Sequence, residues 1–216
     1  MGPLRRKLRR HSGFTLIELL AVILIIGILA GILLTQLGGA EDAAKSSAAR
    51  NLLSQITAAC DHYEDAFGDY PPSSFSDEQG VDNGGTNVGV EALVVALWSK
   101  GYDAGGLLGD VKDGLGNLDG DNSAQTLTDF GTRGLLEILD PWGNPIAYLH
   151  RRDYEQKGRL YLTIDNETGE EVRTAALARK NATTGTFYRE SKFQLLCAGI
   201  DGRFGTEDDI ANFEER

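Results

Sequence analysis

The sequence predicts an α+β protein in which one long N-terminal helix packs on a small antiparallel sheet. Apolar residues run without a charged side chain through residues 19–34, and they then recur at helical spacing as far as Phe67. Short segments that alternate between apolar and polar residues follow at 146–150, 159–164 and 192–198, which is typical of strands with one buried face. At 216 residues, the chain has room for one ordinary domain and an appendage.

The first 13 residues form a basic leader that precedes an apolar segment. The leader holds five arginine or lysine residues and no acid. Residues 14–37 then span about 36 Å as a helix, enough to cross a hydrocarbon core of about 30 Å. Basic residues before this segment and acids after it place the leader in the cytoplasm and the rest of the chain outside. We therefore predict a single-pass membrane protein with residues 14–37 as the transmembrane segment.

A secretory signal peptide and a plain signal anchor are the alternatives to this assignment. No small-x-small cleavage site follows the apolar run, which disfavours the signal peptide. Glu18 disfavours the plain anchor, because a bare carboxylate in lipid costs several kcal/mol and therefore needs a partner.

Gly13 and the Phe-Thr-Leu-Ile-Glu-Leu-Leu run that follows it resemble the cleavage signature of type IV prepilins. The resemblance implies that a prepilin peptidase cuts between Gly13 and Phe14 and methylates the new Phe14 amine. It also implies that Glu18 of one subunit neutralises the Phe14 amine of its neighbour during filament assembly. The carboxylate in the apolar segment would then have its partner. A signal-anchored binding domain that never polymerises is the alternative class.

Residues 38–67 are predicted to continue the helix as an amphipathic segment. Apolar residues recur at three- and four-residue steps, with charged residues on the other faces. The predicted stripe comprises Ala44, Ala48, Leu52, Ile56, Ala59, Tyr63 and Phe67. Gly38-Gly39 is the weak point, since each glycine costs about 1 kcal/mol relative to alanine. Gly68 and the prolines that follow it end the helix.

Residues 68–216 are predicted to form a globular domain. A short helix is expected at 90–100, ahead of the three strands. Residues 101–134, rich in glycine and aspartate, predict a long irregular excursion, and the charged residues 165–190 receive no assignment. Two turn motifs mark the domain. They are Gly-Asp-Tyr-Pro at 68–71 and Asp-Pro-Trp-Gly-Asn-Pro at 140–145.

Together, the two turn motifs resemble those of the major pseudopilin of type II secretion systems. The resemblance implies a pilin/pseudopilin fold with the helix in a bacterial inner membrane and the globular domain in the periplasm. It implies a structural subunit of a homopolymeric filament, the pseudopilus. The implied partners are the prepilin peptidase, other pseudopilins and the inner-membrane assembly platform. A type IV pilin for adhesion, motility or DNA uptake is the alternative. The stretches 101–134 and 165–190 are longer than that family usually has.

A terminal acidic loop, residues 199–209, combines four carboxylates with three glycines. Carboxylate oxygens suit a hard cation, and glycines let the backbone curl so that its carbonyls point inward. The spacing does not match an EF-hand, but the loop resembles the calcium loop of major pseudopilins. The implied ligands are Asp201 and Asp208, with Asp209 and Glu207 as further candidates and backbone oxygens near Ala198 and Arg203. A solvated acidic loop without metal is the alternative.

Charge and motifs exclude several function classes. Outside the leader, 16 basic residues face 32 acidic ones, so the domain repels phosphates and we expect no nucleic acid partner. The chain lacks the zinc-protease, nucleophile-elbow, Walker and Cys-x-x-Cys motifs, and we predict that it is not an enzyme. A second acidic run, residues 110–121, is predicted to be a solvated loop rather than a second calcium site. Cys60 and Cys197 form either a disulfide or two buried free thiols.

Processing can be tested at the leader junction. We expect Gly13→Val to leave a full-length precursor in the membrane, because a bulky side chain cannot occupy the glycine position of the peptidase. Mass spectrometry of the wild-type protein should show a chain that begins at N-methylated Phe14. A mature chain that begins at Met1, or beyond residue 30, would contradict the prepilin interpretation.

Overall fold

The computed structural model describes residues 14–81, 85–99, 101–102, 104, 106–109 and 111–215, without the side chains of residues 33–38 and 40. The predicted leader 1–13, with Gly13, therefore lies outside the described residues, as does Asp110 of the second acidic run. The chain divides into two compact units, Met1–Ala43 and Ala44–Arg216.

Helix α1, Leu16–Phe67, contains 52 residues and stays helical through both Gly38 and Gly39. Thr15 and Glu18 form a capping box at its start, which satisfies N–H groups that have no partner within the helix. At its end, Gly68 adopts φ +78°, and its N–H donates to the Glu64 carbonyl at 2.7 Å. Glycine adopts this left-handed conformation without steric cost, so α1 ends where the sequence predicts.

The N-terminal unit presents apolar side chains along its described length. All the large apolar residues described between Phe14 and Ile32 are exposed, from 45% at Val22 to 82% at Leu16. Among the described residues, no helix has a stretch long and apolar enough to cross a membrane. Residues 33–37 of the predicted transmembrane segment lie outside the described side chains.

In the C-terminal unit, one face of α1 is buried. Ala49, Leu53, Ile56 and Cys60 are at most 1% exposed and follow one another at helical spacing. The predicted stripe is confirmed in its middle, where Ile56 and Ala59 are buried and Leu52 and Tyr63 pack partly buried against the core. It is wrong at its ends, where Ala44, Ala48 and Phe67 are exposed. Pairs of adjacent apolar residues, such as Leu52-Leu53, leave the helical face ambiguous in the sequence. Contact with the rest of the domain selects one of the two faces.

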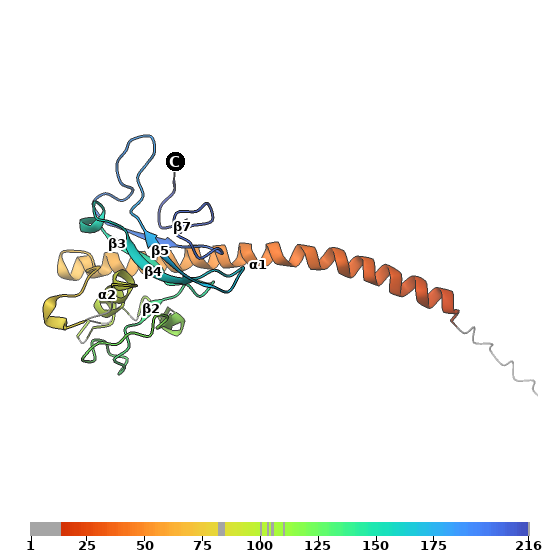
Figure 1. The fold of residues 1–216 in the computed structure, drawn as a ribbon, viewed down its shortest axis with the longest axis horizontal. Helices are drawn as coiled ribbons and strands as arrows, with labels where there is room; N and C mark the ends of the chain where they lie inside the picture. The colour runs from red at the N-terminus through yellow and green to blue at the C-terminus, as the bar shows by residue number, and fades with distance from the viewer. Residues whose placement is uncertain are drawn as a thin grey trace, which may run out of the picture. The chain divides into compact units, whose positions relative to one another are not determined.

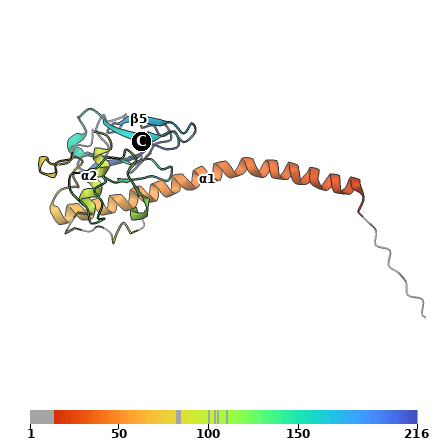
Figure 2. The same cartoon turned by 60° about the horizontal axis from the view of Figure 1, so that its bottom comes forward.

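Three small antiparallel sheets complete the domain within the described residues; Figure 1 shows them with the part of α1 that belongs to this unit, and in Figure 2 β5 lies away from the helix. The largest has the order β3 (Ala147–His150), β6 (Phe193–Cys197), β7 (Ile210–Ala211). The second pairs β4 (Arg159–Ile164) with β5 (Glu171–Ala176), and the third pairs β1 (Leu115–Gly116) with β2 (Glu137–Ile138). The predicted α+β class, N-terminal helix and small antiparallel sheets are confirmed.

The remaining helical elements of the described residues lie between α1 and β1, except for one that lies between β3 and β4. Helix α2 is Val88–Leu97, close to the predicted 90–100. Three short 3₁₀ helices are η1 (Asp77–Gln79), η2 (Val111–Gly114) and η3 (Arg151–Asp153). Residues 101–134 are largely irregular where they are described, as predicted, whereas the unassigned stretch 165–190 contains β5.

The core of the C-terminal unit joins α1, α2 and the strands. Leu93 and Leu97 of α2 are fully buried in the same cluster as Tyr148 of β3 and Leu195 of β6. Gly89 lets α2 approach the sheet closely, because a Cβ at this position would lie 2.5 Å from both the Tyr148 carbonyl and the Tyr161 hydroxyl. These contacts fix α2 against β3.

Cys60 and Cys197 both belong to this core. Each is fully buried and carries a free thiol. Burial raises the pKa of both thiols well above their ordinary value, so both stay protonated. The structure therefore contains two buried thiols rather than the possible disulfide.

Candidate functional site

The first candidate site is the start of α1, where Phe14 and Glu18 lie within one turn. Glu18 Oε2 accepts hydrogen bonds from the Thr15 backbone N–H at 2.8 Å and from the Thr15 hydroxyl at 2.7 Å. In return, the Glu18 backbone N–H donates to Thr15 Oγ1 at 3.3 Å. The carboxylate is thus turned back toward the end of the helix that carries Phe14, whose side chain is 74% exposed.

Sequence reasoning sought a partner for Glu18 only in a neighbouring subunit. The structure adds a partner in the same chain, Thr15. The spacing Thr-x-x-Glu before an apolar run is a capping-box signal, and it was available in the sequence. The partial positive charge at a helix N-terminus favours a carboxylate at this position.

The second candidate site is the terminal acidic loop, which connects β6 to β7. Because both strands belong to one sheet, the two ends of the loop are anchored at neighbouring positions. Gly199 and Gly202 adopt φ +66° and +65°. A Cβ on Gly199 would collide with the Asp208 carboxylate, and one on Gly202 with the Ile164 carbonyl. Glycine is therefore required for the loop to curl over Asp208.

Three predicted ligands converge inside this loop on the hydroxyl of Thr206. Asp208 Oδ1 lies 2.7 Å from Thr206 Oγ1, and one oxygen each of Asp201 and Asp209 lies 3.5 Å from it. The Arg203 carbonyl oxygen, predicted as a backbone ligand, lies 3.0 Å from the same hydroxyl. A hydroxyl has one proton and can satisfy only one of these four acceptors.

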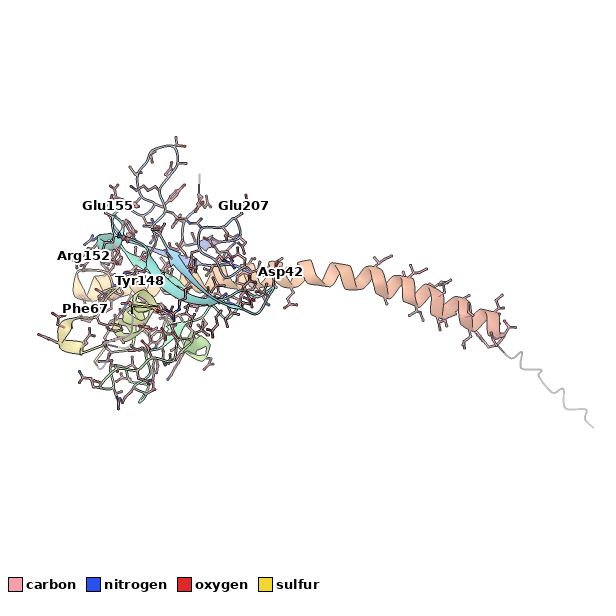
Figure 3. The ribbon with its side chains drawn as sticks, viewed as in Figure 1. Asp42, Phe67, Tyr148, Arg152, Glu155 and Glu207 are labelled. Atoms are coloured by element: carbon pink, nitrogen blue, oxygen red, sulfur yellow. The ribbon has the colours of Figure 1, made fainter. Side chains whose placement is uncertain are left out.

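Backbone N–H groups hold two of these carboxylates in place. Asp208 Oδ2 accepts from the N–H groups of Ile200 at 2.7 Å and Asp201 at 3.3 Å. Asp201 Oδ1 accepts from the Arg203 N–H at 2.8 Å. Glu207 is exposed and lies at the outer edge of the loop in Figure 3. The structure thus brings Asp201, Asp208 and Asp209 together and leaves Glu207 apart from them.

Asp209 differs from the other two aspartates because it pairs with an arginine. Its Oδ2 accepts from the Gly205 N–H at 2.7 Å and contacts the guanidinium of Arg179. Burial raises the pKa of Asp209 to about 6, while the Gly205 N–H and Arg179 act in the opposite direction. Arg179 lies in the stretch 165–190, to which the sequence assigned no structure, so this partner was missed.

The second acidic run also differs from its prediction. Asp119 and Asp121 are partly buried rather than solvated, although Asp113 is exposed. One carboxylate oxygen of Asp119 lies within 4.8 Å of oxygens from Glu91 of α2 and Glu137 of β2. Local hydrogen bonds of Asn117 account for the partial burial of these aspartates. Asn117 Oδ1 accepts from the Gly120 N–H at 2.8 Å, and the Asn117 side-chain amide donates to the Asp121 carbonyl at 2.8 Å. This tight turn directs the acids inward.

Glu137 is 0% exposed, as is Glu91 of the same cluster. Its carboxylate accepts hydrogen bonds from Asn87 Nδ2 at 2.8 Å and from the Leu118 N–H at 3.0 Å. Burial nevertheless raises the pKa of Glu137 to about 7, with Asp119 adding to the rise. The pKa of Asp121 also rises to about 7, through burial and through the charge of Asp119. Burial raises the pKa of Asp119 as well, and the positive charge of Arg173 acts in the opposite direction.

The two described histidines are held by structural hydrogen bonds. His62 Nδ1 lies 2.9 Å from the Tyr102 hydroxyl. His150 is buried, accepts from the Arg152 N–H at 3.2 Å, and its Nε2 lies 3.5 Å from Asp69. Burial lowers the pKa of His150, which favours its neutral form. Neither histidine has a serine, threonine or cysteine among these contacts.

Comparison with known proteins connects these sites to a family. Residues 8–34 match the family model described as the prokaryotic N-terminal methylation motif. The type II secretion system core protein G of Pseudomonas aeruginosa is 34% identical over 144 residues, which cover 65% of this chain and 75% of that protein.

Two further relatives match nearly the whole chain. The type II secretion system core protein G of Aeromonas hydrophila is 25% identical over 205 residues, covering 95% of this chain and 94% of the relative. The Escherichia coli protein of the same name is 26% identical over 206 residues, covering 94% and 92%. No solved structure matches the chain significantly.

The raised pKa of Glu137 predicts a pH dependence of stability. The folded state holds this proton more tightly than the unfolded state, whose ordinary pKa is 4.5. The contribution of Glu137 is therefore most favourable below about pH 4.5 and is lost as the pH rises toward 7. We expect Glu137→Gln to reduce the loss of melting temperature between pH 5 and pH 7.5 in the full chain, measured in detergent. Glu78→Gln, at an exposed position, is the control and should keep the wild-type slope. An unchanged slope in Glu137→Gln would show that this carboxyl does not titrate as described.

Proposed function

This chain belongs to the family of the type II secretion system core protein G, and we propose on that basis how it serves as a structural subunit of the secretion pseudopilus. It is made as a membrane-anchored precursor, processed at the Gly13–Phe14 junction, and assembled into a homopolymer. The observation that carries the proposal is the start of α1, where the methylation motif, Phe14 and the Thr15-bonded Glu18 carboxylate coincide. The role is structural rather than enzymatic.

Membrane anchoring follows from the apolar surface of the N-terminal unit. Every large apolar side chain described between Phe14 and Ile32 is exposed in the isolated chain. Such a surface is stable only when it is covered. Lipid of the bacterial inner membrane covers it before assembly, and helices of neighbouring subunits cover it in the filament. The globular domain lies in the periplasm, where the other pseudopilins and the assembly platform reach it.

Assembly depends on the charge of Glu18. Cleavage after Gly13 creates a cationic amine at Phe14, which has to leave water when the subunit packs into the filament. A carboxylate from a neighbouring subunit offsets that charge. Until then, Thr15 satisfies the Glu18 carboxylate within its own chain. Glu18 therefore has a partner at both stages, first for folding of the helix end and then for packing.

Two substitutions at Glu18 separate charge from helix capping. Glu18→Gln retains an oxygen that accepts from the Thr15 N–H, because glutamine also occupies this position of a capping box. Glu18→Ala removes both the charge and the cap. We expect both variants to be cleaved and methylated normally, and both to lose most incorporation into pili in a filament-shearing assay. Normal assembly of Glu18→Gln would show that capping alone matters.

We also propose that the terminal loop binds calcium and that the folded domain depends on it. The donor set supports this: carboxylate oxygens of Asp201 and Asp208 and the Arg203 carbonyl surround Thr206 Oγ1. A surface cavity of about 570 Å³, lined in part by Thr206 and Asp209, opens beside the loop. Calcium would offset the repulsion among these acids and hold the β6–β7 connection closed.

Calcium dependence can be measured by melting the full chain in detergent. A ligand that binds only the folded state at a hundredfold excess over its Kd adds about 2.7 kcal/mol, so chelation should lower the melting temperature by several degrees. Magnesium should rescue poorly, because it requires tight octahedral geometry and gives up water reluctantly. Asp208→Asn should melt like the chelated wild type and ignore chelator, whereas Glu207→Gln should behave as wild type. Identical melting curves with calcium and with chelator would remove the site.

A further inference from the structure

Arg179 is held in a fixed position beside the terminal loop. It lies in the connection between β5 and β6, and its backbone is bound by the side chain of Gln194. The Arg179 N–H donates to Gln194 Oε1 at 2.7 Å, and its carbonyl accepts from Gln194 Nε2 at 2.9 Å. Gln194 belongs to β6 and is 0% exposed. Arg179 is thus anchored by the strand from which the terminal loop begins.

The guanidinium of Arg179 contacts acids on both sides of β7. One terminal nitrogen pairs with Asp209 at the end of the loop, and the other pairs with Glu215 beyond the strand. The Asp209 side chain is 0% exposed, and that of Arg179 is 20% exposed. An ion pair shielded from water to this degree is not a surface pair that salt would screen. It ties the end of the loop and the tail of the chain to one cation.

The Arg179 pair changes the ligand set of the loop. Asp209 has Oδ2 engaged by both Arg179 and the Gly205 N–H, while neither Asp208 nor Asp201 forms an ion pair with an arginine of the described residues. Arg203, the cation within the loop, lies 3.7 Å from Asp165 instead. Asp209 therefore differs from Asp201 and Asp208 in one respect: all three reach Thr206, but only Asp209 also has an oxygen paired with an arginine.

We propose that Arg179 is a tethered counter-ion that closes the terminal loop without calcium and competes with calcium for Asp209. This inference rests on the proposed calcium binding for its second half only. Arg179 and calcium are attracted by the same group of carboxylates, so each weakens the binding of the other. Such coupling is reciprocal: if calcium competes with Arg179 for the loop, removal of Arg179 tightens the binding of calcium.

The test compares wild type with Arg179→Gln, Arg179→Lys and Arg159→Gln, each as the full chain in detergent. Arg159, the first residue of β4, is a matched control outside the terminal loop, because its side chain is 19% exposed and pairs with the 8% exposed Asp153 at 3.1 Å. Melting temperature is measured in chelator and in calcium, and calcium affinity is measured by titration calorimetry. Arg179→Lys retains the charge and loses the two-sided contact.

We expect Arg179→Gln to melt well below wild type in chelator and to recover most of the loss in calcium. Its calcium affinity should rise about tenfold, because a unit charge beside a partly solvated site has been removed and Asp209 has been released. Arg179→Lys should keep calcium affinity near wild type. Arg159→Gln should lose stability equally with and without calcium.

Three results would overturn the inference. They are an unchanged or weaker calcium affinity in Arg179→Gln, the same affinity change in Arg179→Lys, and the same calcium rescue in Arg159→Gln. If Arg179→Gln fails to fold in chelator, the calcium affinity of Arg179→Lys decides whether the charge of Arg179 or its two-sided contact controls calcium binding. If the wild type does not respond to calcium while Arg179→Gln binds it, the proposed calcium dependence of the wild type is wrong. The counter-ion role of Arg179 is then supported.

Discussion

Burial of β6 is the constraint on which the C-terminal unit depends. All five residues of this strand are buried, and it pairs with β3 on one side and with β7 on the other. Asn212 connects β6 to α1: its side chain accepts from the Leu195 N–H at 3.0 Å and donates to Thr57 at 3.2 Å. Because β6 is locked between these neighbours, the two features attached to it are also placed. The terminal loop leaves from its end, and Gln194 in its middle holds Arg179.

The other recurring constraint is that an acid removed from water needs a proton, an N–H group or a cation. The chain uses each of these in a different place. Glu18 is satisfied by the Thr15 N–H and hydroxyl at a helix start. Glu137, with a pKa of about 7, is stabilised by holding a proton, and Asp209 is paired with an arginine. Asp201 and Asp208 are held by backbone N–H groups with oxygens left over, which is why the calcium proposal falls on them.

Much of the fold and one of the sites could be predicted from local sequence. The continuous apolar run and the Gly68 stop determine the length of α1, because helix length depends on neighbours along the chain. The alternating segments predict β3, β4 and β6 for the same reason. The predicted face of α1 was wrong at its two ends and omitted the buried Leu53, since Leu52 and Leu53 are equally apolar and only the domain against which α1 packs decides between them. The turn at 117–122 was also misjudged, because a solvated and an inward-facing aspartate look the same in sequence.

The sequence by itself indicated a prepilin-like motif at the start of α1 and an acidic loop for which we propose a cation. Both features are contiguous motifs, and residues close in the chain are necessarily close in space. Only the tertiary structure decided which acids keep free oxygens. Arg179 and Asp209 are 30 residues apart and meet because β6 and β7 pair. Glu91, Asp119 and Glu137 meet because α2, the turn at 117–122 and β2 pack together. Such contacts depend on sheet pairing and helix packing, which no short motif encodes.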